Sequence, residues 1–314
     1  MALFIQQFFL IHSSSHLETN EMREPLQSEY RPKHSTETAL LKILNDLLLV
    51  VDSKHCVTLL LLDMSAAFDT VNHNILLHRL ENSFGITGSV NTWLRSYFTE
   101  RYQCVNIGGC SSTPIKMDTG MPQGSILGPK GYPSYVSPLF EIVRKHSVNI
   151  HMYADDTQLY LGFNLSQYEA AKLQMERCIA GIRSWLSANC LKLNDDKTEL
   201  LFIGQKHSLS KLPTASLNIG STTVKSCTSA KNIGAVIDSE LKMVEHVNHI
   251  SKACYLGLRS LSKLRPYLNE ETAAILVHSF ITCRLDSLNG VLIGEPKYCL
   301  NRLQNNAARI VPQI

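Results

Sequence analysis

The chain has 314 residues, which at about 150 residues per domain suggests two domains, or one domain with large appendages. Hydrophobic residues make up 44% and charged residues 18%, so a large buried core is expected and wholesale disorder is excluded. Lys and Arg number 30 against 27 Asp and Glu, a net charge of +3, which excludes a histone-like polycation and an acidic tail.

The cysteines and the N-terminal segment indicate the compartment. None of the nine cysteines forms a Cys-x-x-Cys pair, so neither a disulfide framework nor a zinc knuckle is indicated. Residues 2–11 are apolar but lack a basic leader and a cleavage site, and a bilayer span takes about 20 residues. We expect a frayed start to the fold, with a signal peptide as the minority interpretation. The protein is expected to be soluble and intracellular, nuclear or cytoplasmic, and neither secreted nor membrane-bound.

Periodicity predicts the elements of the first half. Ser35 precedes apolar residues at helical spacing, which indicates a capped helix from about 36 to 51. The continuous apolar run 57–62 predicts a strand buried on both faces that ends at Asp63. Residues 71–100 are typical of two helical pieces, and residues 102–118 of short strands.

The second half alternates between strands and helices. Residues 148–161 predict a hairpin with its turn at Asp155 and Asp156, followed by a helix over 166–190 and a strand over 199–204. A Ser/Thr-rich stretch begins near 207, and a helical segment begins near 242. The order of elements before 207 predicts an α+β fold, in which a sheet is layered on helices.

Three carboxylates follow predicted strands. A carboxylate such as Asp63 at the end of an apolar strand is costly unless it holds a cation. Asp155 and Asp156 can share one site only at a turn, because strand neighbours point to opposite faces. A solvated Asp-Asp turn is the ordinary alternative, although the absence of Asn-Gly or Asp-Gly implies backbone strain. If the two strands are neighbours, these side chains suit Mg²⁺ and nucleotidyl transfer.

Five strings follow one another along the chain: residues 26–36 (LQSEYRPKHST), 63–71 (DMSAAFDTV), 120–129 (with GMPQGS and LGP), 153–157 (YADDT) and 191–199 (with LKLN and KTE). Together, in this order, they resemble the reverse transcriptase domain of non-LTR, LINE-type retrotransposons of the jockey-like or CR1-like kind. The resemblance covers roughly residues 25–205, and more loosely extends to about 311.

The resemblance implies a right-hand polymerase fold with an antiparallel palm sheet on helices. It divides the chain into a poorly defined segment 1–24, fingers and palm 25–207, connecting strands and loops 208–241, and a helical thumb-like region 242–314. The implied activity is RNA-directed DNA synthesis. Two Mg²⁺ ions, with Mn²⁺ as a substitute, would join deoxynucleoside triphosphates (dNTPs) to a DNA primer on an RNA template.

The resemblance also implies roles for single residues. Asp63, Asp155 and Asp156 match the metal-binding carboxylates, and Lys197 matches a lysine suited to protonate pyrophosphate. Phe68 matches an aromatic gate that excludes a 2′-hydroxyl group. Alone, Phe68 is interpreted as a core residue and Lys197 as a solvated one.

Further positions match nucleotide-binding and nucleic-acid-binding residues. Arg31 matches the arginine that binds the triphosphate, and Gln123 and Gly124 match the loop beside the incoming nucleotide. Alone, these are typical of a surface arginine and an ordinary turn. On the C-terminal helix three basic residues lie at i, i+7 and i+11 and could hold template–primer phosphates, or form a solvated helix face: Lys252, Arg259 and Lys263.

Measured against the family pattern, the chain is expected to be an N-terminally truncated domain with a shortened stretch at 302–309. Other departures and two alternatives remain. Residues 130–133 (KGYP) replace an apolar helical segment, and proline inside a helix costs about 3 kcal/mol, so we expect a broken or shifted helix. Glu29 stands where the family prefers glycine, beside Arg31. One alternative is an inactive relic that at most binds nucleic acid. Another is a telomerase-like or intron-encoded palm enzyme, against which residues 27–36 argue.

Overall fold

The structure, a computed structural model, describes residues 15–122, 124–125, 127–213, 216–220, 222–292 and 298–312, without the side chains of 298 and 299. The apolar segment 2–11 and Gln123 lie outside these residues. Within them, no helix combines the length and the apolar character needed to cross a bilayer. Every cysteine whose side chain is described is free.

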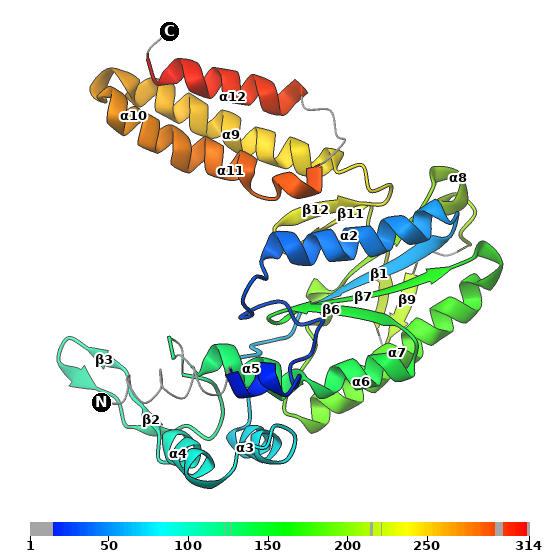
Figure 1. The fold of residues 1–314 in the computed structure, drawn as a ribbon, viewed down its shortest axis with the longest axis vertical. Coiled ribbons are helices and arrows are strands. Elements are labelled where there is room, and N and C mark those ends of the chain that lie inside the picture. Colours follow the sequence, from blue (N-terminus) through cyan, green and yellow to red (C-terminus); the bar gives the residue numbers. More distant parts are fainter. Residues whose placement is uncertain are drawn as a thin grey trace.

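A four-stranded antiparallel sheet lies at the centre of the chain (Figure 1), in the order β6-β7-β1-β8. Its strands are β1 (Cys56–Leu62), β6 (Asn149–Tyr153), β7 (Asp156–Phe163) and β8 (Glu199–Ile203). All seven residues of β1 are buried, because β1 is an inner strand with side chains packed against both of its faces. This confirms the predicted two-sided strand and the antiparallel sheet.

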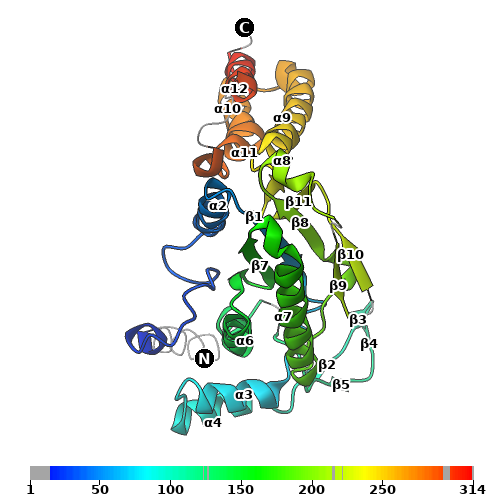
Figure 2. The same cartoon turned by 90° about the vertical axis from the view of Figure 1, so that its right-hand side faces the viewer.

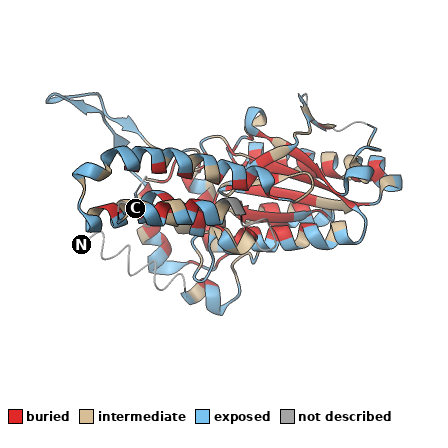
Figure 3. Cartoon of the chain, turned by 90° about the horizontal axis from the view of Figure 1, so that it is seen from above, coloured by how far each residue is buried: buried red, intermediate tan, exposed pale blue. Residues whose placement is uncertain are grey.

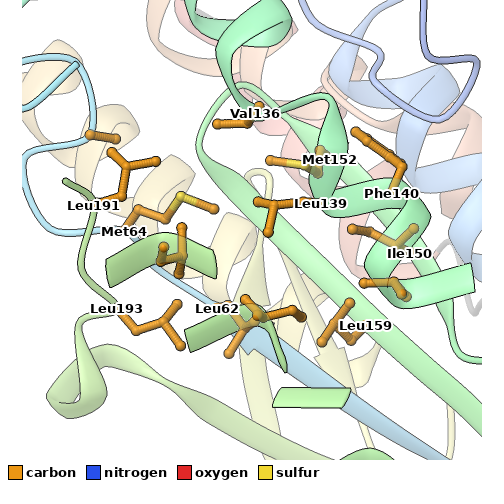
Figure 4. Close-up of a cluster of buried hydrophobic side chains, with 14 of the residues drawn as sticks. Leu62, Met64, Val136, Leu139, Phe140, Ile150, Met152, Leu159, Leu191 and Leu193 are labelled. Carbon is orange, nitrogen blue, oxygen red and sulfur yellow. The ribbon is translucent and has the colours of Figure 1, made fainter. Parts of the chain in front are cut away.

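Helices cover both faces of the sheet (Figure 2). Helix α2 (Thr36–Asp52) is capped by Ser35. The Ser35 side chain accepts a hydrogen bond from the Thr38 N–H, which confirms the predicted cap. The helix buries Leu40, Ile43 and Leu47 against one face. Helices α6 (Pro138–Lys145) and α7 (Tyr168–Ala188) cover the other face. Figure 4 shows this second core, in which side chains of α5 (Gly128–Val136) and α6 meet those of the strands and of Leu191 and Leu193.

Helix α5 (Gly128–Val136) contradicts the prediction of a broken helix, because it continues through Pro133. Tyr132 and Tyr135 are completely buried, and their hydroxyl groups donate to Met64 Sδ at 3.1 Å and to the Asn189 carbonyl at 2.6 Å. Burial of these large rings outweighs the poor local propensity. The segment ends soon after the proline, and α6 starts as a separate helix.

Helices α3 (His73–Asn82) and α4 (Gly88–Phe98) confirm the predicted pair. The chain then forms short antiparallel pairs, β2 with β5 and β3 with β4, which project from the body (Figures 1 and 3) and are exposed throughout. Their bounds are β2 Tyr102–Gln103, β3 Asn106–Ile107, β4 Cys110–Ser111 and β5 Ile115–Lys116.

Two further hairpins follow β8 and pack against the sheet. Their strands are β9 (Ser216–Ile219), β10 (Thr222–Lys225), β11 (Ser229–Asn232) and β12 (Ala235–Asp238). Leu217 and Ile219 join the core on the α7 side, whereas Ala235 and Ile237 join the core under α2.

The C-terminal part is helical and has a core of its own, which contains Cys254, Leu258, Ile281 and Leu303. Its α-helices are α9 (Val244–Leu264), α10 (Glu270–Val277), α11 (Cys283–Asp286) and α12 (Tyr298–Ile310). In Figure 1 they form the bundle at one end of the molecule. The short remaining elements are the helix α8 (Lys206–Leu209), a π-helical turn (His278–Thr282) and 3-10 turns at Leu165–Gln167, Asp195–Lys197, Arg265–Tyr267 and Asn289–Leu292.

Candidate active site

The β6–β7 turn presents Asp155. Tyr153 pairs with Asp156 across the hairpin, so the two turn residues are Ala154 and Asp155, and the predicted turn is wrong by one residue. The register is fixed by buried side chains, because Met152 and Thr157 are paired and both face inward. Asp156 is therefore the first residue of β7. Ala154 has a positive φ of 56°, which is the backbone strain that the absent glycine implied.

Asp63 lies at the end of β1, beside β7, since Leu62 pairs with Thr157. Its backbone carbonyl accepts from the Asn194 N–H at 2.9 Å, and its Oδ2 accepts from Asn194 Nδ2 at 3.0 Å. Lys197 Nζ lies 3.4 Å from the same Oδ2. The loop after α7 thus fixes the Asp63 carboxylate and brings Lys197 to it, and Asn194 is a site residue to which the sequence assigned no role.

The carboxylates repel one another. The surrounding protein atoms desolvate Asp156 and raise its pKa, and the negative charges of Asp155 and Asp63 raise that pKa further, against an opposing effect of Lys197. Asp156 lines two adjoining clefts. One, of about 390 Å³, also contains Asp63, Lys197 and Asn232, and the other, of about 400 Å³, contains Asp155. Asp156 therefore borders both the cleft of Asp63 and the cleft of Asp155.

Glu29 belongs to the same acidic region. It lines the cleft of Asp155, and its pKa is raised first by burial and then by the charge of Asp155. The sequence flagged Glu29 only as a departure beside Arg31. The structure instead turns it toward the carboxylates, so a fourth negative group borders the site.

Phe68 follows β1 in a turn and is half-buried. Its ring stacks on that of Tyr132, with centroids 4.7 Å apart and an interplanar angle of 27°. Burial, and after it the charges of Asp155 and Asp156, raise the pKa of Tyr132. Phe68 packs against the core, as the interpretation from the residue alone expects.

Two of the predicted nucleotide-binding residues, Arg31 and Gly124, do not line the clefts of the carboxylates. Arg31 is half-buried, and its Nη1 donates to the Pro25 carbonyl at 3.2 Å. It lines a small pocket with Arg23, Lys130 and Glu29, and Glu29 also lines the cleft of Asp155. Gly124 is exposed and has a positive φ of 75°, a conformation that favours glycine. Gln123 lies outside the described residues.

The three basic residues of α9 are exposed on one side of the helix: Lys252, Arg259 and Lys263. Cys254, Leu258 and Leu261 on the other side are buried in the C-terminal core. The predicted two-sided character of this helix is therefore confirmed, and its basic side is open to a ligand.

The donor set suits a divalent cation. Carboxylate oxygens are the ligands that hard cations prefer, and a cation would relieve the repulsion that raises the pKa of Asp156. Within the part of the chain that the structure describes, no group of three His, Cys, Asp or Glu side chains is arranged closely enough to hold a metal ion. Phosphate oxygens of a substrate commonly supply the remaining ligands of Mg²⁺.

The fold and this site define a palm-type polymerase, and residues 12–258 match the family described as reverse transcriptase (RNA-dependent DNA polymerase). The chain belongs to this family, whose members depend on divalent metal ions. The relatives below confirm the predicted non-LTR, LINE-type branch.

Curated relatives come from insect transposons. The chain is 26% identical over 301 residues to a probable RNA-directed DNA polymerase from transposon BS of Drosophila melanogaster, covering 91% of this chain and 32% of that protein. It is 26% identical over 234 residues to the RNA-directed DNA polymerase from mobile element jockey of the same species, covering 72% and 24%. The chain thus spans a third or less of the length of these relatives.

Solved structures with the same fold include telomerases. A Candida tropicalis telomerase in complex with a fragment of telomeric RNA superposes with a TM-score of 0.53 and 13% identity, covering 97% of this chain and 47% of that one. An apo form of the enzyme, truncated from its C-terminal domain, gives 0.51 and 14%, covering 76% and 44%. These similarities confirm the predicted α+β polymerase fold.

Proposed function

We propose that this chain is the polymerase region of a non-LTR retrotransposon and catalyses RNA-directed DNA synthesis. The observation that carries the proposal is the meeting of Asp63, Asp155 and Asp156 at the adjoining ends of β1 and β7, beside open clefts. The match of residues 12–258 to the reverse transcriptase family supports the assignment.

In the proposed reaction, the 3′-hydroxyl group of a DNA primer loses its proton to solvent, and its oxygen bonds to the α-phosphorus of a dNTP. The bond from that phosphorus to the bridging oxygen breaks, and pyrophosphate leaves. Two Mg²⁺ ions, or Mn²⁺ in their place, would supply charge neutralisation and activation of the hydroxyl group. Asp63, Asp155 and Asp156 would hold them. Lys197, an exposed lysine 3.4 Å from Asp63, is suited to give a proton to the leaving pyrophosphate.

Successive regions of the chain would have separate roles in binding the substrates. Residues 25–207 would form fingers and palm, 208–241 a connection, and 242–314 a thumb. Phe68 would discriminate against a 2′-hydroxyl group at the base of the site, with Arg31, Gln123 and Gly124 contacting the incoming nucleotide. The phosphates of the RNA template and DNA primer would lie on the basic side of α9, formed by Lys252, Arg259 and Lys263.

Primer extension on an RNA template tests the proposal. The purified chain should incorporate dNTPs in Mg²⁺, and Asp155→Ala should lower the rate by about a thousandfold or more, because the charge that holds the cation is lost. Asp52→Ala, at an exposed carboxylate of α2, is the matched control and should retain the rate. Incorporation that survives Asp155→Ala contradicts the site. Binding of nucleic acid without any incorporation would instead favour the inactive relic.

A further inference from the structure

The segment before α2 lies along the edge of the sheet, next to the turn that carries Asp155. The Met152 N–H donates to the Leu26 carbonyl at 2.9 Å, and the Ser28 N–H donates to the Met152 carbonyl at 3.0 Å. These two hydrogen bonds extend the sheet beyond β6 by a short piece of chain. Gln27, between the two bonded residues, is only 5% exposed.

The Gln27 side chain binds the backbone of the turn. Its Oε1 accepts from the Ala154 N–H at 3.2 Å, and its Nε2 donates to the Ala154 carbonyl at 3.2 Å. The same Oε1 also accepts from the Glu29 N–H at 3.3 Å. One amide thus satisfies both polar backbone groups of a residue 127 positions away and ties Glu29 to the same point.

Ala154 is the residue of the turn whose backbone conformation must be stabilised by its surroundings. Its φ of 56° lies in the left-handed region, which a side chain with a Cβ adopts only when its surroundings enforce it. Ala154 is buried, at 6% exposure, so the loss of its two hydrogen bonds with Gln27 would leave its N–H and C=O groups poorly satisfied. Without them, the turn would lose both the strained conformation and the direction in which the next residue, Asp155, points.

We propose that Gln27 is a positioning residue, whose amide holds Ala154 in its left-handed conformation and so aligns the Asp155 carboxylate with Asp63. The proposal rests on the proposed polymerase function. It explains how this turn has alanine at position 154, where a hairpin turn ordinarily has glycine. Gln27, which is distant in sequence, supplies the restraint. Gln27 does not touch the substrate, and its effect passes entirely through the turn.

Gln27→Met keeps the side-chain volume and removes all three hydrogen bonds. We expect kcat of primer extension to fall 10- to 100-fold with the KM for the template–primer unchanged. The Kd for Mn²⁺, followed by electron paramagnetic resonance titration without substrate, should rise at least threefold. Gln174→Met is the matched control. It removes a hydrogen bond of 2.7 Å from Gln174, on α7, to the carbonyl of His146 at the end of α6, and it should leave both quantities unchanged.

A double-mutant cycle with Ala154→Gly tests the turn itself. Glycine adopts a positive φ without help, so Gln27→Met in the Ala154→Gly background should change kcat and the Mn²⁺ Kd by less than threefold. Equal losses in both backgrounds would overturn the proposal. So would a Gln27→Met protein that melts at a lower temperature but keeps kcat and Mn²⁺ affinity. If the unmodified chain incorporates no dNTP, the proposed function fails, while the Mn²⁺ titration still decides the role of Gln27.

Discussion

His151 lies in β6, three residues before Ala154 of the turn, and is 2% exposed. Its Nε2 is 3.0 Å from Ser28 Oγ, and burial lowers its pKa to about 4. The unfolded chain, with an ordinary pKa near 6.5, takes up this proton first as the pH falls. The stability due to neutral His151 is therefore complete above pH 6.5 and is lost as the pH falls from about 6.5 to 4.

Replacing His151 should flatten that pH dependence. His151→Gln keeps a polar group near Ser28 but cannot gain a charge, so its free energy of unfolding should change less between pH 7 and pH 4.5. The pKa gap corresponds to a maximum of about 3 kcal/mol. Urea denaturation at both pH values measures the effect. Parallel pH profiles for the two proteins would contradict the assignment.

Gln158 and Asn232 form a buried pair that joins the strand of Asp156 to the β11–β12 hairpin. Gln158 Nε2 donates to Asn232 Oδ1 at 2.9 Å, and both side chains are at most 3% exposed. Asn232→Ala leaves the Gln158 amide without its partner and should cost about 1–3 kcal/mol in the free energy of unfolding. Adding Gln158→Met should cost less than the sum of the single changes. Strictly additive losses would contradict the coupling.

At this scale, the sequence predicts residues whose chemistry is visible locally. Asp63 stands out at the end of an apolar strand, and Asp155 and Asp156 stand out as neighbouring carboxylates at a hairpin turn. The order of the five strings assigns their roles. Gln27 and Asn232 could not be found in this way, since a buried amide is defined by a partner far away in the chain. Glu29 was noticed as a departure beside Arg31, and only the fold shows that it also borders the cleft of Asp155.

Among the helices and strands, prediction from sequence was most successful where the apolar residues follow one clear spacing. The two-sided burial of β1 and the cap of α2 follow directly from the residues concerned. It failed at α5, where Pro133 argued for a break but burial of Tyr132 and Tyr135 preserves the helix. It also missed the hairpin turn by one residue, because register depends on which side chains face the core, and 155–156 looked as turn-like as 154–155.

The contact between α2 and β7 depends on Gly162. A Cβ at this position would lie 2.8 Å from Val50 Cγ1, and a β-branched side chain has little freedom to move away. Gly162→Ala should therefore lower the free energy of unfolding by about 1–3 kcal/mol. In a Val50→Ala background the same change should cost much less, as thermal unfolding of the four proteins can measure. An equal loss in both backgrounds would show that the close approach is not the cause.

For the whole molecule, a net charge of +3 hides an uneven distribution. Carboxylates gather at the palm site, while Lys252, Arg259 and Lys263 are exposed together on α9. The proposed contact with phosphates makes binding depend on salt, because each neutralised phosphate releases counterions. The charge count could not reveal this, since it averages over surfaces that only folding separates.

Substituting these three residues by Gln should weaken binding of an RNA–DNA duplex and lower the slope of log K against log salt by about 2–3. Fluorescence anisotropy at several salt concentrations measures the slope. A variant with Gln at three other exposed lysines, Lys54, Lys145 and Lys211, carries the same charge and should retain the original slope. Equal slopes for both triple variants would remove the basic side of α9 from the binding surface.

The inner position of β1 has a consequence for motion. Because β1 pairs with β7 along one side and β8 along the other, its amide protons can reach deuterated solvent only when the sheet itself opens. Asp63 therefore extends from the part of the chain expected to exchange most slowly, whereas Asp155 stands on a two-residue turn. The two halves of the site are therefore held in different ways: Asp63 by the strands on both sides of β1, and Asp155 by a two-residue turn that is bound to Gln27.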